Sequence, residues 1–159
     1  MSGSFDILIV GIGGQGTILA SNILGEACLI ENRHLKGAET HGMAQRGGSV
    51  ESHIRSGGEF GPLITPGQAD LLISFDLLEA LRYSHFLKQG GKMVVNSHLV
   101  LPTSVYTQKL TPPTKEDITT ALKKHPLCLL DADSLAVEAG SPLSANVVML
   151  GAASSAMPL

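Results

Sequence analysis

The sequence predicts an α/β protein with a three-layer α/β/α, Rossmann-like fold, whose sheet is mostly parallel with one antiparallel edge strand. An apolar run of strand length at residues 5–10 is followed by a glycine-rich loop that opens a helix. Further apolar runs alternate with helical patterns along the chain, as in βαβ units. Residues 49–55 have apolar and polar side chains on opposite faces, which is typical of a half-exposed strand near a sheet edge.

The first half of the chain begins with the strand 5–10 and continues into a helix predicted over residues 17–31. A short second strand is predicted at 34–36, before the alternating strand. Apolar residues recur in the helix at a spacing that gives it one buried face. That predicted face consists of Leu19, Ile23, Ala27 and Ile30.

The second half begins with a buried strand at 69–75. Asp76 is expected to cap the following helix, with Glu79 completing a capping box. That helix is predicted to reach Leu87 and to be stopped by Gly90 and Gly91. The remaining predicted elements are a strand at 92–96, a helix at 114–124, a strand at 127–130, a short helix to 138 and a helix at 146–157.

Size and composition bound the function. A chain of 159 residues with 43% hydrophobic and 16% charged residues is most simply one domain with a real core. A net charge of −3 disfavours nucleic acid as a partner. The sequence has no apolar run of transmembrane length and no signal peptide, so we expect a cytoplasmic protein that does not bind membranes.

Its two cysteines, Cys28 and Cys128, are too few to hold a cubane iron–sulfur cluster, and we expect them to be small buried apolar residues.

The glycine loop, Gly11-Ile12-Gly13-Gly14-Gln15-Gly16, is a candidate cofactor site. Its glycines suit a tight turn, a close approach to a ligand and close helix–strand packing, and the helix start after it favours an anion. A turn that kept its glycines only for packing remains the alternative. A dinucleotide site also needs an acid at the end of the second strand, whereas this strand is expected to end at Gly37 and Glu39 lies beyond it. The candidate residues are Gly11, Gly13, Gly14, Gln15 and Gly16.

A second loop is predicted over residues 39–48. From His41 to Gly47 it has no β-branched or large aliphatic side chain except methionine, so it suits a ligand or partner surface better than a core. Arg46 can direct several donors to a carboxylate or phosphate, although a solvated arginine is the plain alternative. The residues expected to face a partner or active site are Glu39, Thr40, His41, Gln45, Arg46, Gly47 and Gly48.

No complete catalytic or metal-binding arrangement is visible. The six histidines are scattered and none pairs at helical spacing, so no metal site is expected. Asp131 and Asp133 follow a strand, where α/β active sites lie, but helix capping explains them equally well. No catalytic residue is therefore assigned.

Four segments carry a family resemblance: the glycine loop, residues 39–50 (Glu-Thr-His-Gly-Met-Ala-Gln-Arg-Gly-Gly-Ser-Val), residues 62–64 and residues 69–72. They resemble the gamma subunit, or gamma domain, of 2-oxoacid:ferredoxin oxidoreductases. The second loop is the specific part and is most similar to the indolepyruvate oxidoreductase beta subunit. The similarity runs from about Ile7 to Gly151.

The resemblance implies an enzyme that oxidatively decarboxylates a 2-oxoacid to an acyl-CoA and reduces ferredoxin. It implies that thiamine diphosphate, Mg²⁺, the iron–sulfur clusters and CoA belong to the full complex, and that this chain alone binds none of them and is inactive. Its partners would be the thiamine- and cluster-bearing subunits, with ferredoxin as an indirect partner and a homodimer in isolation as a further option. Residues 1–159 would form a single gamma-type domain, and because relatives usually continue with more helix, this member is either short or lacks a tail.

Two other functions stay open from the sequence. One is a free-standing Rossmann-type oxidoreductase that binds NAD(P) or flavin. The other is a regulatory or scaffold domain without an enzyme partner. Binding of a nucleotide by the purified chain would favour the first, and failure to copurify with a thiamine-bearing subunit would favour the second.

Overall fold

The computed structural model describes residues 4–41, 47–58 and 61–158 and contains a six-stranded sheet in the order β2-β3-β1-β4-β5-β6. Strands β1, β4, β5 and β6 are parallel, as predicted, whereas β3 is antiparallel to both β1 and β2. The antiparallel strand thus lies second in the order, with β2 outside it at the edge. The strands are β1 (Phe5–Ile12), β2 (Leu35–His41), β3 (Ser49–Ser56), β4 (Ala69–Ser74), β5 (Leu87–Asn96) and β6 (Leu127–Leu130).

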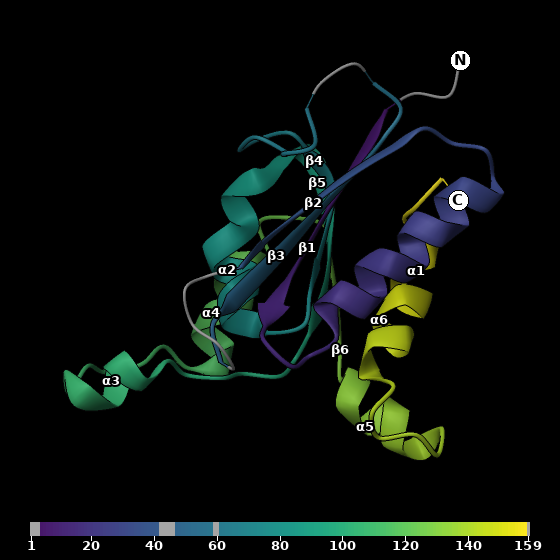
Figure 1. The fold of residues 1–159 in the computed structure, drawn as a ribbon. Helices are drawn as coiled ribbons and strands as arrows, with labels where there is room; N and C mark the ends of the chain where they lie inside the picture. The colour runs from purple at the N-terminus through teal and green to yellow at the C-terminus, as the bar shows by residue number, and fades with distance from the viewer. Residues whose placement is uncertain (1–3, 42–46, 59–60, 159) are drawn as a thin grey trace.

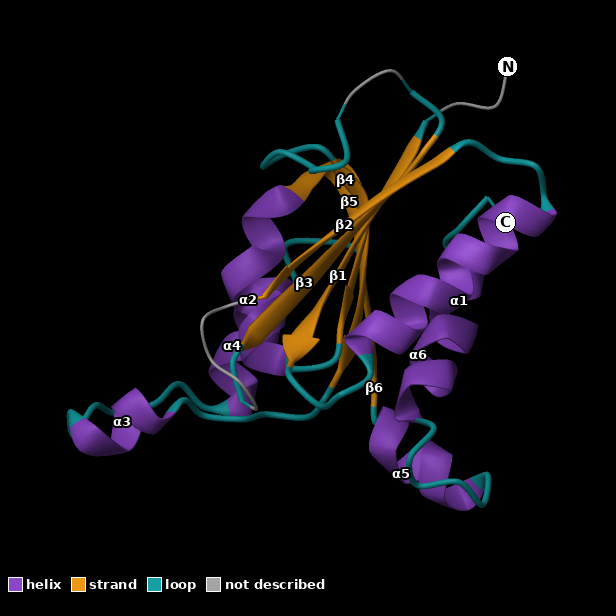
Figure 2. Ribbon diagram, in the orientation of Figure 1, coloured by secondary structure: helices purple, strands orange, loops and turns teal. Residues whose placement is uncertain are grey.

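Helices cover both faces of the sheet, which confirms the three-layer prediction. Figures 1 and 2 view the sheet nearly edge-on, with α2 and α4 on one side and α1, α5 and α6 on the other. The short helix α3, which was not predicted, extends away from the layers, and all its residues are at least partly exposed. The helices are α1 (Thr17–Ile30), α2 (Leu77–Tyr83) continued by a 3₁₀ turn (Ser84–Phe86), α3 (Thr103–Thr107), α4 (Lys115–Leu122), α5 (Ala132–Glu138) and α6 (Ala145–Ser154).

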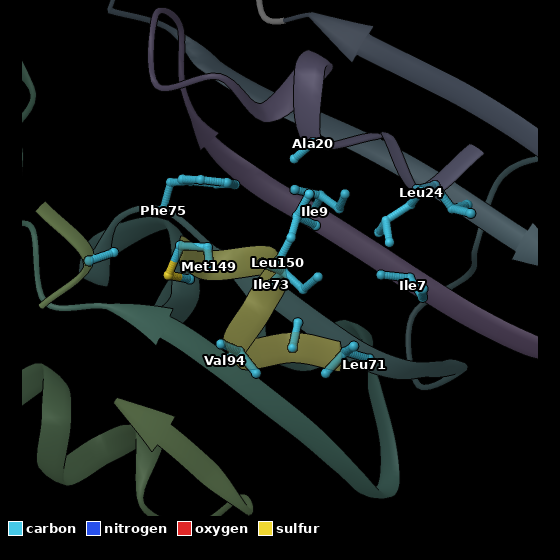
Figure 3. Packing of buried hydrophobic residues seen from close by; sticks show 13 residues of the cluster. Ile7, Ile9, Ala20, Leu24, Leu71, Ile73, Phe75, Val94, Met149 and Leu150 are labelled. Atoms are coloured by element: carbon cyan, nitrogen blue, oxygen red, sulfur yellow. The ribbon is translucent and has the colours of Figure 1, made fainter. Parts of the chain in front are cut away.

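Two apolar clusters hold the layers together, one on each face of the sheet. Because side chains alternate along a strand, Ile7 and Ile9 of β1 enter one cluster, while Leu8 and Val10 enter the other. Figure 3 shows the first cluster, in which Met149 and Leu150 of α6 lie against the strands. Burial on both faces explains why β1 and β4 are continuous apolar runs.

The buried face of α1 differs from the prediction. Ala20, Leu24 and Cys28 enter the core, whereas Leu19 is 53% and Ile30 is 80% exposed. The predicted set was wrong because the helix is apolar nearly all round, so periodicity alone could not identify the face that meets the sheet.

The segment after β4 also differs in detail. Asp76 caps α2 as predicted, since its Oδ1 accepts hydrogen bonds from the amides of Leu78 and Glu79. The Glu79 side chain, however, turns to Ser49 and Arg82 instead of completing a capping box. Gly90 and Gly91 do not end a helix, because they lie inside β5 where its pairing with β4 shifts register.

The later elements follow the prediction closely. Thr114 and Asp117 form a capping box at the start of α4. Strand β6 has the predicted bounds, and Asp131 caps α5 by accepting from the amide of Ser134. In the described part of the chain no helix is long and apolar enough to cross a membrane.

Candidate functional site

The glycine loop lies at the carboxyl end of β1, beside the carboxyl ends of β4, β5 and β6. After β1 the chain moves to β2 and β3 on one side, and then returns to β4 on the other. This reversal between β1 and β4 is where doubly wound α/β folds bind ligands. The glycine loop therefore occupies the position of a binding site in this architecture.

The turn in the glycine loop is held by Gln15. The side-chain oxygen of Gln15 accepts a hydrogen bond from the backbone amide of Ile12 at 2.8 Å. The backbone amide of Gln15 donates to the Ile12 carbonyl at 3.1 Å. Gln15 was predicted as a cofactor contact, and the structure gives it a role in closing the turn. Contact with a cofactor stays a prediction for all five loop residues.

The glycines meet different steric demands. A Cβ on Gly11 would lie 2.7 Å from Thr17 Cγ2 and 3.1 Å from Phe75 Cβ, so any other residue there would force its neighbours to shift. Gly16 caps α1 in the left-handed region with φ 84° and packs against Asn146 of α6. Gly14 is exposed, with φ 100°. Packing thus explains Gly11 and Gly16 without a ligand, while Gly14 faces open space.

The two predicted loops meet. The amide of Gly13 donates to the carbonyl of Gly48 at 2.9 Å, and the register of β1 with β3 places Ile12 opposite Ser49. The second loop is shorter than predicted, since Glu39, Thr40 and His41 belong to β2 and pair with β3. Gly47 and Gly48 follow as a turn, with Gly47 exposed at φ 96°. Gln45 and Arg46 lie outside the described residues.

A polar cluster around the buried carboxylate of Glu79 adjoins the end of the second loop. The Ser49 hydroxyl donates to Glu79 Oε2 and lies 3.1 Å from the Tyr83 hydroxyl. Glu79 is 3% exposed, and its other oxygen accepts from Arg82 at 3.0 Å. Burial raises the pKa of Tyr83, with Glu51 and Glu79 acting in the same direction, while the hydrogen bond between Tyr83 and Ser49 and the charge of Arg82 oppose the shift. Sequence reasoning missed this cluster because Glu79 resembled a helix-capping residue.

A second cluster lies across the carboxyl edge, in a cleft of about 200 Å³. Asn96, at the end of β5, accepts a hydrogen bond from the amide of Ala132 and donates to Asp133 Oδ2, both at 3.0 Å. His98 Nδ1 lies 3.3 Å from the same Asp133 oxygen. Of the two aspartates considered from sequence, Asp131 caps a helix and Asp133 faces this cleft. The lining consists of Gly14, Gln15, Phe75, Asn96, His98, Asp133, Pro142, Leu143 and Ala145.

Asp76, which follows β4 at this edge, joins the start of α2 to the segment after β5. It is fully buried, and its Oδ2 accepts from the amide of Val100 at 2.7 Å while Oδ1 caps α2. Burial raises the pKa of this carboxyl, although the three backbone hydrogen bonds and His98 oppose the shift. With every oxygen directed to a backbone amide, Asp76 serves the fold and not a reaction.

The arrangement does not favour a dinucleotide. In a dinucleotide-binding fold the acid that holds the ribose ends the strand next to β1. Here that neighbour on the β2 side is the antiparallel β3, which begins with Ser49 at this edge. Glu39 lies one strand further out, on β2. Within the described ranges no group of three or more His, Cys, Asp or Glu side chains could hold a metal ion.

Comparison with known proteins identifies the class. Residues 6–159 match the model of the pyruvate ferredoxin/flavodoxin oxidoreductase family. The chain belongs to this family.

Several relatives within this family are similar to the chain over most of its length. The chain is 38% identical to indolepyruvate oxidoreductase subunit IorB of Pyrococcus horikoshii, over 93% of this chain and 75% of the relative. It is 40% identical to the IorB subunit of Archaeoglobus fulgidus, over 92% of this chain and 74% of the relative. The chain is 33% identical to the pyruvate/ketoisovalerate oxidoreductases common subunit gamma of Thermococcus litoralis, over 95% of this chain and 77% of the relative.

Solved structures share the fold. Pyruvate oxidoreductase subunit PORC of Thermotoga maritima superposes with a TM-score of 0.70 at 22% identity, covering 98% of this chain and 79% of that one. The gamma subunit of a keto/oxoacid ferredoxin oxidoreductase from Geobacter sulfurreducens gives a TM-score of 0.61 at 27% identity, covering 93% and 74%. The curated relatives are subunits of oxidoreductases, and none of these likenesses supports a free-standing enzyme.

Proposed function

We propose that this chain is the subunit without cofactors of a 2-oxoacid:ferredoxin oxidoreductase of the indolepyruvate, or arylpyruvate, type. The complex would oxidatively decarboxylate a 2-oxoacid to an acyl-CoA and pass electrons to ferredoxin. The observation that carries this proposal is the 38–40% identity to IorB subunits over nearly the whole chain, against 33% for the common gamma subunit.

The cysteines of the chain support a subunit that holds no redox cofactor itself. Its two cysteines lie apart: Cys28 is buried in α1 as predicted, whereas Cys128, predicted to be buried, is exposed on the edge strand β6. Two separated thiols do not fit an iron–sulfur cluster, which is usually held by four cysteine thiolates. Thiamine diphosphate, Mg²⁺, the clusters and CoA are therefore assigned to the complex as a whole, and the thiamine- and cluster-bearing subunits are the partners we expect. A cytoplasmic location is part of the same proposal.

The edge that holds both loops is the surface we assign to contact with the catalytic subunit. The hydrogen bond from Gly13 to Gly48 supports this assignment, because it holds the glycine loop against the described end of the second loop. Glu39, Thr40, His41, Gln45, Arg46, Gly47 and Gly48 keep their proposed role of facing a partner or active site.

The test measures indolepyruvate-dependent reduction of a viologen dye, with thiamine diphosphate and CoA supplied. The chain alone is expected to give no turnover, and the complex with the co-expressed catalytic subunit is expected to be active. Turnover by the chain alone, or a failure to form a complex, would overturn the proposal. An Arg46→Ala chain with normal stability but reduced activity or assembly would locate the contact on the second loop.

A further inference from the structure

An arm of residues 101–113 leaves the carboxyl edge of the sheet between β5 and α4, with α3 at its middle. Figure 1 shows that it stands away from both helical layers, and none of the residues of α3 is buried. Two large side chains of the arm are open to solvent, since Tyr106 is 69% and Leu110 is 54% exposed. This segment is called the α3 arm below.

Both ends of the α3 arm are fixed to the body of the protein. Before it, the amide of Val100 donates to the buried carboxylate of Asp76 at 2.7 Å, and Leu99 packs against the apolar cluster on the α2 side of the sheet. After it, Thr114 and Asp117 form the capping box that begins α4. The two ends therefore set where the arm projects, although the arm itself lies outside the layers.

The arm also has a defined local shape. The amide of Leu110 donates to the carbonyl of Val105 at 3.1 Å, and Lys109 has a left-handed conformation with φ 52°, which is the usual way to close a helical turn. Pro102 precedes the turn and Pro112 follows it, and proline fixes φ at each position. A segment that is ordered before it binds loses less entropy on association.

The surface of the arm has the composition of an interface. Of its thirteen residues only Lys109 is charged. In the described part of the chain the Tyr106 hydroxyl takes part in no hydrogen bond, and its ring contacts no other ring. The centres of protein interfaces are poor in charged residues and rich in tyrosine, which often supplies much of the binding energy.

The size of this surface favours a larger partner over a second copy of the chain. A tyrosine side chain buries at most about 250 Å², and a leucine side chain buries less. A stable complex needs about 800 Å² on each partner, so two copies that met only through their arms would fall well short. The arm suits one part of a wider interface. It begins just after His98, which lines the cleft at the carboxyl edge that we assign to contact with the catalytic subunit.

We infer that the α3 arm inserts Tyr106 and Leu110 into an apolar pocket of the catalytic subunit. The partner is a subunit of the same complex, so this inference rests on the proposed function. The contact extends the proposed surface beyond the two loops. Because the tyrosine ring ends in a hydroxyl, the pocket is expected to have apolar walls and a hydrogen-bonding group at its base.

Hydroxyl-radical footprinting tests the inference on the chain alone and in its complex with the co-expressed catalytic subunit. Oxidation of Tyr106 and Leu110 is expected to fall several-fold in the complex, because both side chains are exposed in the chain alone. Ile30 is the internal control, since it is 80% exposed at the end of α1 that lies away from the glycine loop, and it should stay reactive.

Unchanged oxidation of Tyr106 and Leu110 in the complex would overturn the arm contact while leaving the proposed function intact. Absence of any complex would overturn both. Protection of the two side chains in a dimer of the chain alone would overturn the inference in favour of a second copy.

Variants provide an independent check. Tyr106→Ala is expected to weaken the complex at least about tenfold, as truncation of an interface hot spot does. The melting temperature of the variant chain alone should match that of the parent, because the side chain projects from the body. Tyr106→Phe keeps the ring and should lose less affinity than Tyr106→Ala. Ile30→Ala removes an exposed apolar side chain elsewhere and should bind as the parent does. Equal affinities of the Tyr106→Ala and parent chains, or equal weakening by Ile30→Ala, would overturn the inference.

Discussion

The amide of Gly13 donates to the carbonyl of Gly48 at 2.9 Å and so ties together two loops that are 35 residues apart in sequence. Because the donor and the acceptor are both backbone groups, this hydrogen bond depends on the path of the chain and not on side-chain identity. It extends the β1–β3 pairing, in which Gly11 lies opposite Val50. Any change that moves the glycine loop therefore also moves the start of β3 and the end of the second loop.

Gly11→Ala is expected to destabilise the protein by about 1–3 kcal/mol, the usual cost of overpacking. The added Cβ would lie 2.7 Å from Thr17 Cγ2 and 2.8 Å from Gln15 Oε1, so α1 or the turn must shift. Urea unfolding measures the loss. Gly151→Ala is the control, since this exposed glycine in α6 has nothing within 4 Å of the new Cβ and should stabilise the helix by up to about 1 kcal/mol. Equal effects at both positions would contradict the steric argument.

Ser49→Ala is expected to lower the free energy of unfolding by about 1.5–3 kcal/mol, because it removes a hydrogen bond to the nearly buried carboxylate of Glu79. Ser134→Ala is a matched control. There the hydroxyl donates to Asp131 Oδ2 at 2.7 Å, but the pair is exposed and water can replace it. The control should lose less than about 1 kcal/mol. A similar loss in both chains would show that burial of Glu79 does not strengthen the Ser49 contact.

Asn96→Asp is expected to destabilise the fold at neutral pH by about 2 kcal/mol or more, because a carboxylate replaces the amide that donates to Asp133 at 3.0 Å. The acceptor for the Ala132 amide would remain. The double variant Asn96→Asp with Asp133→Asn exchanges donor and acceptor and should recover most of the loss. Additive losses in a double-mutant cycle would show that the two side chains do not interact.

Much of the fold could be predicted because local patterns and tertiary packing agree. Strands β1 and β4 are buried on both faces, so their apolar runs identify them directly. Thr114 and Asp131 cap helices with side chains suited to that position, and both helices begin where predicted. The glycine loop and the second loop could be paired from sequence only through the family resemblance, which the family match confirms.

Other features depend on contacts that no local pattern contains. The face of α1 is chosen by where the sheet lies, and a helix that is apolar on several sides gives no signal of that choice. Gly90 and Gly91 resembled a helix stop, yet Gly91 lies where a Cβ would come 2.9 Å from the Ala69 carbonyl of the neighbouring strand. Glu79 lies three residues after Asp76, as in a capping box, but its buried carboxylate accepts hydrogen bonds from the Ser49 hydroxyl and from Arg82 instead.

His53 illustrates the same limit, because it lies on the polar face of the strand predicted to be half-exposed, and the structure buries it to 3% exposure. The segment around Ile64 covers it, and the Ile64 amide donates to His53 Nδ1 at 3.1 Å. Nε2 lies 3.9 Å from Glu51, and the ring contacts Phe86 edge-on. Burial lowers the pKa of His53, and Arg55 acts in the same direction, while Glu51 opposes them.

This lowered pKa predicts a loss of stability in mild acid. Since the folded chain resists protonation of His53, the unfolded chain binds more protons as the pH falls below the ordinary histidine pKa of about 6.5. The contribution is complete above that pH and is lost progressively toward the lower pKa of the folded state. Protonated Nδ1 could no longer accept from Ile64, which is the structural reason for the loss.

Urea unfolding at pH 7.5 and pH 5.5 measures this effect, with His53→Asn as the matched variant. The Asn side-chain oxygen can still accept from the Ile64 amide but does not titrate, so this chain should lose less stability between the two pH values than the parent does. Taking the difference between the two chains removes contributions from other groups, including Asp76, whose raised pKa acts in the opposite direction. The same pH dependence in both chains would show that His53 takes up a proton equally in the folded and unfolded states over this range, so that folding does not lower its pKa.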